Sequence, residues 1–170
     1  MHKPDGVIDV FLQPGELYFG DRYTRIRTLL GSCVSLVLWH KAECLGGMCH
    51  YMLPSRRNHN GQFDGRYADE ALHLLLKEIR NSGTQPNDYR ISLFGGGNMF
   101  AGAMTQQSIG LMNVNAGLEL LAAHGLQCHF KHAGGEGYRN LIFEVCSGDV
   151  SLRQPSPQQV ASRQYEAKTP

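Results

Sequence analysis

Cys33 and His50 are the two residues whose types and surroundings best support a shared chemistry. Cys33 follows a Gly31-Ser32 step that interrupts an apolar run in "TLLGSCVSLVLWH", residues 28–40. A thiolate is a strong nucleophile, and a neighbouring imidazole takes up the proton that the thiol loses. Backbone N–H groups of the turn would stabilise an oxyanion, which makes Gly31 and Ser32 candidate substrate-binding residues. The pattern predicts attack on a carbonyl, an acyl-enzyme and then hydrolysis. Core packing is the alternative for Cys33, because free cysteine is often buried.

A hairpin between two successive apolar stretches predicts that Cys33 and His50 meet. If Trp39 pairs with Cys44 across the connecting turn, Cys33 lies opposite His50 on one face of the sheet. Directly opposed residues have Cβ atoms about 4.5–5.5 Å apart, which lets a thiol and an imidazole approach each other. The prediction depends on the register, since a slip of one residue turns His50 to the other face.

Alternation along the strand separates Cys49 from His50. The two residues are adjacent, so their side chains point to opposite faces. A zinc site made of Cys44, Cys49 and His50 is therefore disfavoured, and the sequence predicts no metal and no cofactor. A third group usually orients the histidine of a Cys–His pair, and the sequence offers Thr28 and Ser35 for that position.

Hydrophobic spacing predicts the elements that must position these residues. Strand patterns fall at residues 7–12, 26–30, 34–39, 45–53, 89–94, 126–132 and 140–146. Amphipathic spacing predicts one helix from Tyr67 to Ile79 and a second that begins after Ser108 and ends at Gly125. Residues 54–65 form a long polar loop. Strands outnumber helices and the early strands come in succession, so an α+β sandwich is expected.

Composition narrows the class of protein. Hydrophobic residues make up 42% of the 170 residues, which is enough for a core, and the net charge of +1 argues against a nucleic acid or an anionic membrane as partner. No apolar run is long enough for a transmembrane helix, and the first residues do not have the pattern of a signal peptide. We therefore expect a cytoplasmic protein whose five cysteines are free thiols.

Six motifs extend from about residue 7 to residue 152: "LLGSCVSLVLW", "GGMCHYMLP", "YADEALHLLLKEI", "LFGGGNMF", "IGLMNVNAG" and "HAGGEGYRNLIFEVCSGDV". Together they resemble CheD, the family of bacterial chemoreceptor glutamine deamidases. The resemblance implies a fold like that of bacterial toxin deamidases, an α/β/β-type layered sandwich with mostly antiparallel strands and two main helices on one side. Residues 1–153 are then a CheD-like deamidase domain. The polar, proline-bearing segment 154–170 is expected to be a disordered tail.

The resemblance also implies an activity and a set of site residues. Its members hydrolyse glutamine side chains of methyl-accepting chemotaxis receptors, and hydrolysis of receptor glutamate methyl esters is an implied second activity. Cys33 would be the nucleophile and His50 the base, with a threonine as third member. The family's threonine stands six residues before the cysteine, where this chain has Arg27, and Thr28 comes next. A CheC-type phosphatase is an implied partner.

Two other classes of function stay open at this level. One is a different thiol hydrolase, such as a small-molecule amidase or a protease. A small-molecule enzyme needs a deep pocket, whereas a deamidase that acts on a receptor helix needs an open groove. The other is a receptor- or phosphatase-binding module without catalytic activity, which the departure at Arg27 keeps open. Ammonia release from a purified receptor separates these classes.

Overall fold

The structure is a computed structural model that describes residues 4–99 and 108–156. The strands within that part of the chain are β1 (Ile8–Leu12), β2 (Leu17–Gly20), β3 (Thr24–Leu30), β4 (Val34–His40), β5 (Leu45–Cys49), β6 (Arg90–Gly95), β7 (Phe130–Ala133), β8 (Arg139–Glu144) and β9 (Val150–Arg153). The α-helices are α1 (Ala68–Asn81) and α2 (Ile109–Ala123), and a short 3-10 helix, η1, covers Pro86–Asp88.

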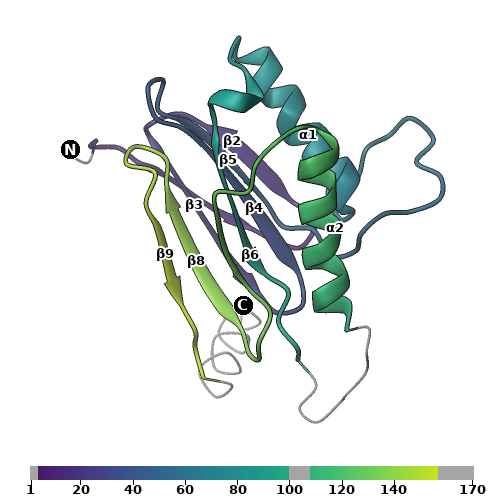
Figure 1. Cartoon of the computed structure of the whole chain (residues 1–170). Coiled ribbons are helices and arrows are strands. Elements are labelled where there is room, and N and C mark those ends of the chain that lie inside the picture. Colours follow the sequence, from purple (N-terminus) through teal and green to yellow (C-terminus); the bar gives the residue numbers. More distant parts are fainter. Residues whose placement is uncertain (1–3, 100–107, 157–170) are drawn as a thin grey trace, which may run out of the picture.

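These elements form three layers. A five-stranded sheet of order β2-β5-β4-β6-β7 lies in the middle, with α1 and α2 on one face and a four-stranded sheet of order β1-β3-β8-β9 on the other (Figure 1). The pairs β1–β3 and β6–β7 are parallel, and the remaining pairs between named strands are antiparallel. The predicted α/β/β-type sandwich, with both main helices on one side, is confirmed.

The middle sheet has a hydrophobic cluster on each face. The cluster toward the other sheet includes Leu12, Ile26, Leu30, Val37, Met48, Phe94, Leu141 and Phe143. The cluster toward the helices includes Leu36, Leu38, Tyr51, Leu72, Leu75, Ile79 and Leu93. β4 contributes alternate residues to both clusters, which explains why its sequence is almost continuously apolar. Each fully buried leucine or isoleucine contributes about 1.5–3 kcal/mol, so these clusters hold the layers together.

The helix predictions are confirmed within two residues. α1 buries its apolar residues at helical spacing and has Asp69 and Glu70 in its first turn, where negative charge complements the helix dipole. Ser108 caps α2, since its hydroxyl oxygen accepts a hydrogen bond from the Leu111 N–H at 3.1 Å. Gly125 follows α2 with a φ of +68°, the left-handed conformation that glycine adopts readily at a helix end.

The register of the β4–β5 hairpin differs from the predicted one by two residues. Trp39 pairs with Gly46, so the predicted pairing of Trp39 with Cys44 is wrong. His40 pairs with Leu45, and residues 41–44 form the turn. Cys44 has a φ of 48°, in the left-handed region that strands exclude, and this conformation assigns it to the turn. A shift of two residues preserves alternation, so every side chain of the hairpin keeps its predicted face.

Other strand boundaries also differ from expectation. The short strands β2 and β9 were not predicted, and both lie at sheet edges, where few residues carry the pattern. β5 ends at Cys49 rather than at residue 53, and β7 begins at Phe130 rather than at residue 126. Residues 157–170 lie outside the described residues, so the disorder of the tail stays a prediction. Neither α-helix of the described chain has the length and apolar character that crossing a bilayer requires.

Candidate active site

Thr28 and His50 link the two sheets through a buried hydrogen bond. Thr28 belongs to β3 of the four-stranded sheet, whereas His50 directly follows β5 of the five-stranded sheet. The Thr28 Oγ1 and the His50 Nδ1 are 2.7 Å apart. Both side chains are buried, and His50 is only 2% exposed. The imidazole is thus oriented by a residue from the opposite sheet.

The hydrogen bonds of Thr28 assign the tautomer of His50. Thr28 Oγ1 donates to the Leu12 carbonyl oxygen at 2.8 Å. Because a hydroxyl has one proton, Oγ1 accepts in its contact with His50, and Nδ1 carries the ring proton. Nε2 then presents a lone pair. It is buried and has no hydrogen-bond partner among the described residues, so it is available to act as a base.

Burial keeps the His50 ring neutral. Desolvation lowers the pKa of His50 to about 4, although the Leu12 carbonyl and the Glu16 carboxylate act in the opposite direction. The backbone is fixed by the segment that leads into β2. Gly15 N–H donates to the His50 carbonyl oxygen at 2.8 Å, and His50 N–H donates to the Glu16 carbonyl oxygen at 3.0 Å. His50 is therefore held at both its ring and its main chain.

Cys33 lies on the same face of the five-stranded sheet as His50. It is half-buried at the margin of the hydrophobic cluster between the sheets. The bridge between Val34 and Tyr51 continues the hairpin register, so Ser35 lies directly opposite His50 and Cys33 lies diagonally from it. The shared face is confirmed, whereas direct opposition is wrong. The approach of the Cys33 sulfur to the imidazole stays a prediction.

The two cysteines nearest the hairpin differ in their surroundings. Burial raises the pKa of the Cys33 thiol, so this thiol is protonated at neutral pH. Cys49 is completely buried in the helix-facing cluster, and desolvation raises its pKa to about 12. The prediction that Cys49 and His50 face opposite ways is confirmed. Of these two thiols, Cys33 is the one that is partly exposed.

A run of glycines fixes the turn that carries Cys33. Gly96 N–H donates to the Cys33 carbonyl oxygen and Gly97 N–H to the Gly31 carbonyl oxygen, both at 2.9 Å. A Cβ at Gly95 would lie 2.3 Å from the Cys33 carbonyl oxygen, so this close approach requires glycine. Two amides of this run are therefore engaged by the turn that carries Cys33.

Comparisons with known proteins place this chain in a family. The family model described as "CheD chemotactic sensory transduction" matches residues 52–154, well over half of the chain. A probable chemoreceptor glutamine deamidase CheD 3 from Dechloromonas aromatica is 49% identical over 154 residues, which cover 89% of this chain and 91% of that protein. The chain belongs to the CheD family.

More distant CheD proteins match over a similar length. A probable chemoreceptor glutamine deamidase CheD from Pseudomonas fluorescens is 44% identical over 156 residues, covering 90% of this chain and 88% of that protein. A probable chemoreceptor glutamine deamidase CheD 1 from Leptospira interrogans is 36% identical over 163 residues, covering 90% of this chain and 96% of that protein. The predicted resemblance is confirmed.

The departure of this CheD chain at Arg27 is explained by the alternation of β3. Thr28 faces the other sheet, as do the buried residues on either side of it at alternate positions. Arg27 faces outward, where its Nε lies 2.6 Å from Asp9 Oδ1 and its guanidinium lies over the Phe11 ring. In this chain the hydroxyl that contacts His50 therefore comes from Thr28, not from position 27.

Asn113 of α2 is a site residue that the sequence did not predict. It is fully buried, and its Nδ2 donates to the Ser32 carbonyl oxygen at 3.0 Å and to the Met52 carbonyl oxygen at 2.8 Å. Ser32 precedes Cys33, and Met52 lies two residues after His50. The available signal was a polar residue on the buried stripe of α2, between Gly110 and Gly117. A buried amide of this kind needs hydrogen-bond partners, so a polar residue on this stripe indicates a specific contact.

A cavity of about 300 Å³ lies away from this chemistry. It is lined by residues of β4, β6, β7 and β9 together with Gly148 and Asp149, and neither Cys33 nor His50 contributes to it. Within the described residues, no group of three His, Cys, Asp or Glu side chains is arranged to hold a metal ion.

Proposed function

We propose that this chain is a chemoreceptor glutamine deamidase that converts glutamine side chains of methyl-accepting chemotaxis receptors to glutamate in the cytoplasm. Membership of the CheD family supports the reaction, because the CheD proteins that match along most of this chain are named for it. The five free cysteines agree with a reducing compartment. The observation that carries the proposal is the hydrogen bond from His50 to Thr28, on the face that also holds Cys33.

In the proposed acylation step, His50 Nε2 takes the proton of the Cys33 thiol. The sulfur attacks the side-chain carbonyl carbon of the glutamine, and the carbonyl oxygen becomes an oxyanion near the backbone N–H groups of the Gly31-Ser32 turn. When the tetrahedral intermediate collapses, the C–N bond breaks and the leaving amine takes the proton from Nε2. Ammonia departs, and the glutamyl group stays on Cys33 as a thioester.

Water completes the reaction. Nε2, neutral again, takes a proton from water as its oxygen attacks the thioester carbon, and collapse releases glutamate and returns the proton to the sulfur. Thr28 keeps Nδ1 protonated and the ring oriented through both half-reactions. A glutamate methyl ester would form the same thioester with methanol as the leaving group. We therefore propose receptor methyl-ester hydrolysis as a second reaction of the same site.

We propose a CheC-type phosphatase as a further partner. The first turn of α2 exposes three large apolar side chains, Ile109, Leu111 and Met112, each between 44% and 50% exposed. Clustered exposed apolar residues commonly mark protein-binding surfaces. If the chain were only an adaptor, this surface would suffice and the oriented His50 would have no use, so the paired Thr28 and His50 favour an enzyme.

Ammonia release tests the proposal directly. The purified chain incubated with a purified receptor cytoplasmic fragment should release ammonia, and mass spectrometry should find glutamate in place of specific glutamines. Cys33→Ser should reduce the rate about 10³-fold or more, because the covalent intermediate cannot form. Cys49→Ala is the matched control, since it removes a buried thiol on the other face and lowers stability only. Loss of activity in a folded Cys49→Ala protein, with Cys33→Ser still active, would refute the assignment.

A further inference from the structure

The amide of Asn113 occupies the place where β4 and β5 stop pairing. The last rung of the ladder is the pair Val34 and Tyr51, whose N–H groups each donate to the other's carbonyl oxygen at 3.0 Å. Beyond this rung the strands separate, one toward Cys33 and Ser32 and the other toward Met52. The Asn113 Nδ2 donates one hydrogen to Ser32 and the other to Met52, so it takes the place of the next rung.

The helix that carries Asn113 is fixed closely against this point. Tyr51 Oη donates to the Asn113 carbonyl oxygen at 2.6 Å. A Cβ at Gly117 would lie 2.4 Å from Tyr51 Oη, and a Cβ at Gly110 would lie 2.4 Å from the Gly96 carbonyl oxygen. Neither glycine leaves room for a side chain, because α2 lies against the Gly96 backbone at Gly110 and against the Tyr51 side chain at Gly117. Asn113 is held between them, and its amide cannot withdraw from the two strands without moving the helix.

The chemistry of the side chain at position 113 is specific. Both of its contacts are to carbonyl oxygens, so the position requires a group with two N–H donors. An aspartate has nearly the same shape, but its oxygens would face the two carbonyl oxygens without a proton to share. Asn113 Oδ1 itself has no partner among the described residues. Position 113 thus uses an asparagine for its two donors alone.

We propose that Asn113 is a positioning residue that sets the separation of Cys33 from His50. It touches neither the sulfur nor the imidazole. It fixes the carbonyl groups one residue before the nucleophile and two residues after the base, and so determines where the turn and the strand exit lie relative to each other. The inference rests on the proposed deamidase mechanism, and small displacements of a nucleophile from its base reduce rates strongly.

The test compares Asn113→Asp and Asn113→Ala with Leu121→Ala, a control on the same buried face of α2. Two readouts are measured well below the unfolding temperature of each variant. One is steady-state deamidation of the receptor fragment. The other is the rate of Cys33 alkylation by iodoacetamide against pH, followed by mass spectrometry of the Cys33 peptide, which needs no receptor.

Both Asn113 variants should lower kcat about 10- to 100-fold with little change in KM. The pH profile of Cys33 alkylation should lose the influence of His50 and become that of an ordinary thiol. Leu121→Ala should lose stability with both readouts unchanged. The proposal is overturned if Asn113→Ala and Leu121→Ala behave alike. If Asn113→Asp does not fold, Asn113→Ala, which brings no buried charge, decides. If the wild-type chain releases no ammonia, the proposed function fails while the alkylation profiles still test Asn113.

Discussion

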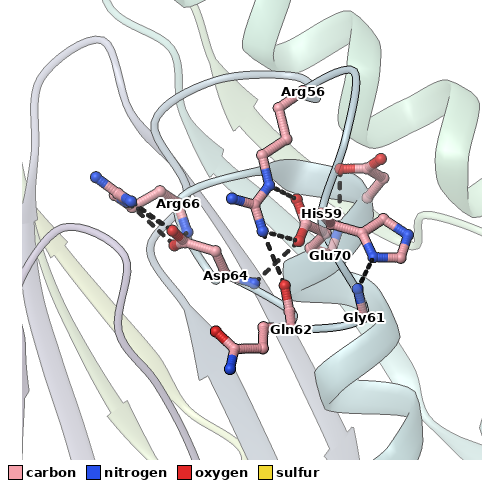
Figure 2. A network of polar contacts seen from close by, with 8 residues as sticks. Arg56, His59, Gly61, Gln62, Asp64, Arg66 and Glu70 are labelled. Carbon is pink, nitrogen blue, oxygen red and sulfur yellow. Dashed lines mark hydrogen bonds and ion pairs between the residues drawn. The ribbon is translucent and has the colours of Figure 1, made fainter.

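The loop between β5 and α1 differs from the end of the sandwich around Cys33 in how its buried polar atoms are paired. In the loop, the buried Glu70 carboxylate accepts from Arg56 Nε at 3.0 Å, from Arg56 Nη2 at 2.9 Å and from the Asp64 N–H at 3.1 Å (Figure 2). Arg66 forms a paired contact with Asp64, and Gly61 N–H donates to His59. The loop projects beyond the layers (Figure 1). The contacts just described hold its two ends and its tip together.

Around Cys33, buried polar atoms lack partners instead. Among the described residues, the buried side-chain atoms without a hydrogen bond are Ser35 Oγ, His50 Nε2, Asn113 Oδ1 and Arg139 Nη1. Each belongs to a residue that adjoins the Gly31–Cys33 turn or His50. Arg139, for example, pairs with Leu30 at the start of the turn, and its Nη1 lies 3.5 Å from where a Cβ of Gly97 would be.

The difference separates the loop, which we expect to contribute to stability, from the end around Cys33, where we propose the reaction. Unpaired buried polar atoms are rare in folded proteins because each one is destabilising. Among the described residues these atoms gather at the end of the sandwich that we propose as the active site, whereas the polar groups of the loop named above are paired. Three predictions test this division, in order of expected effect.

The largest effect is expected from Thr28→Val, which removes the hydroxyl and keeps the shape. The His50 Nδ1–H then lacks its acceptor, and an unsatisfied buried group costs about 1–3 kcal/mol, equivalent to about 5- to 150-fold in rate if the cost falls on the transition state. Turnover at saturating receptor should fall by that factor with KM nearly unchanged. Thr28→Ser should retain more activity. Thr24→Val, at a buried position on the same face of β3, is the control. Wild-type turnover in Thr28→Val would leave a Cys33–His50 pair without a third member.

The pH dependence of stability should separate the two regions. The pKa of His50 is lowered by burial to about 4 from its usual 6.5, so between these values the unfolded state binds a proton that the folded state does not. Stability therefore rises with pH across this window and is lost as the pH falls from 6.5 to 4, by roughly 3 kcal/mol in total. Activity should also persist to a lower pH than an ordinary histidine allows.

Asp64 should affect stability over a lower pH range than His50. The hydrogen bonds from Arg66 hold the pKa of Asp64 at about 2, below its usual 3.8, so its stabilising contribution is present above 3.8 and is lost as the pH falls toward 2. Chemical denaturation across pH should find that His50→Gln removes the upper window and Asp64→Asn the lower one. If either substitution alters both windows, the two regions are coupled and the division does not hold.

The smallest effect is expected from Glu70→Gln in the loop. The amide keeps one acceptor oxygen but loses the charge that Arg56 contacts twice. The melting temperature should fall by a few degrees, with Cys33 alkylation unchanged, as measured by thermal unfolding and peptide mass spectrometry. Glu78→Gln, at an exposed position of the same helix, should change neither. A slower alkylation of Cys33 in Glu70→Gln would mean that the loop also supports the site.

The face of each site residue could be predicted from alternation, but its exact neighbour could not. Cys33, Cys49 and His50 lie on the predicted faces because period-two alternation survives a register shift of two residues. The shift itself depended on Cys44 adopting a left-handed conformation, for which cysteine has no preference that a sequence reveals. Ser35 rather than Cys33 therefore lies opposite His50.

Contacts between layers were the least predictable part of the site. Nothing in the sequence relates Thr28 on β3 to His50 after β5, since the two sheets must first stack. Without the family resemblance, Thr28 and Ser35 were equal candidates. Asn113 was missed because its partners are backbone carbonyls, which no sequence pattern distinguishes. The short edge strands β2 and β9 were missed for lack of a long enough alternating pattern.

The hydrogen bond between Thr28 and His50 also links activity to the order of folding. β4 and β5 are neighbours in sequence, whereas β3 pairs with β8, and the contact of Arg25 with Glu144 in that pair spans 119 residues. Pairing over such separations forms late. A newly synthesised chain would acquire the hairpin with Cys33 and His50 before the sheet that supplies Thr28. We expect the thiol to stay unreactive until the sheets dock, so that an incomplete molecule modifies no protein.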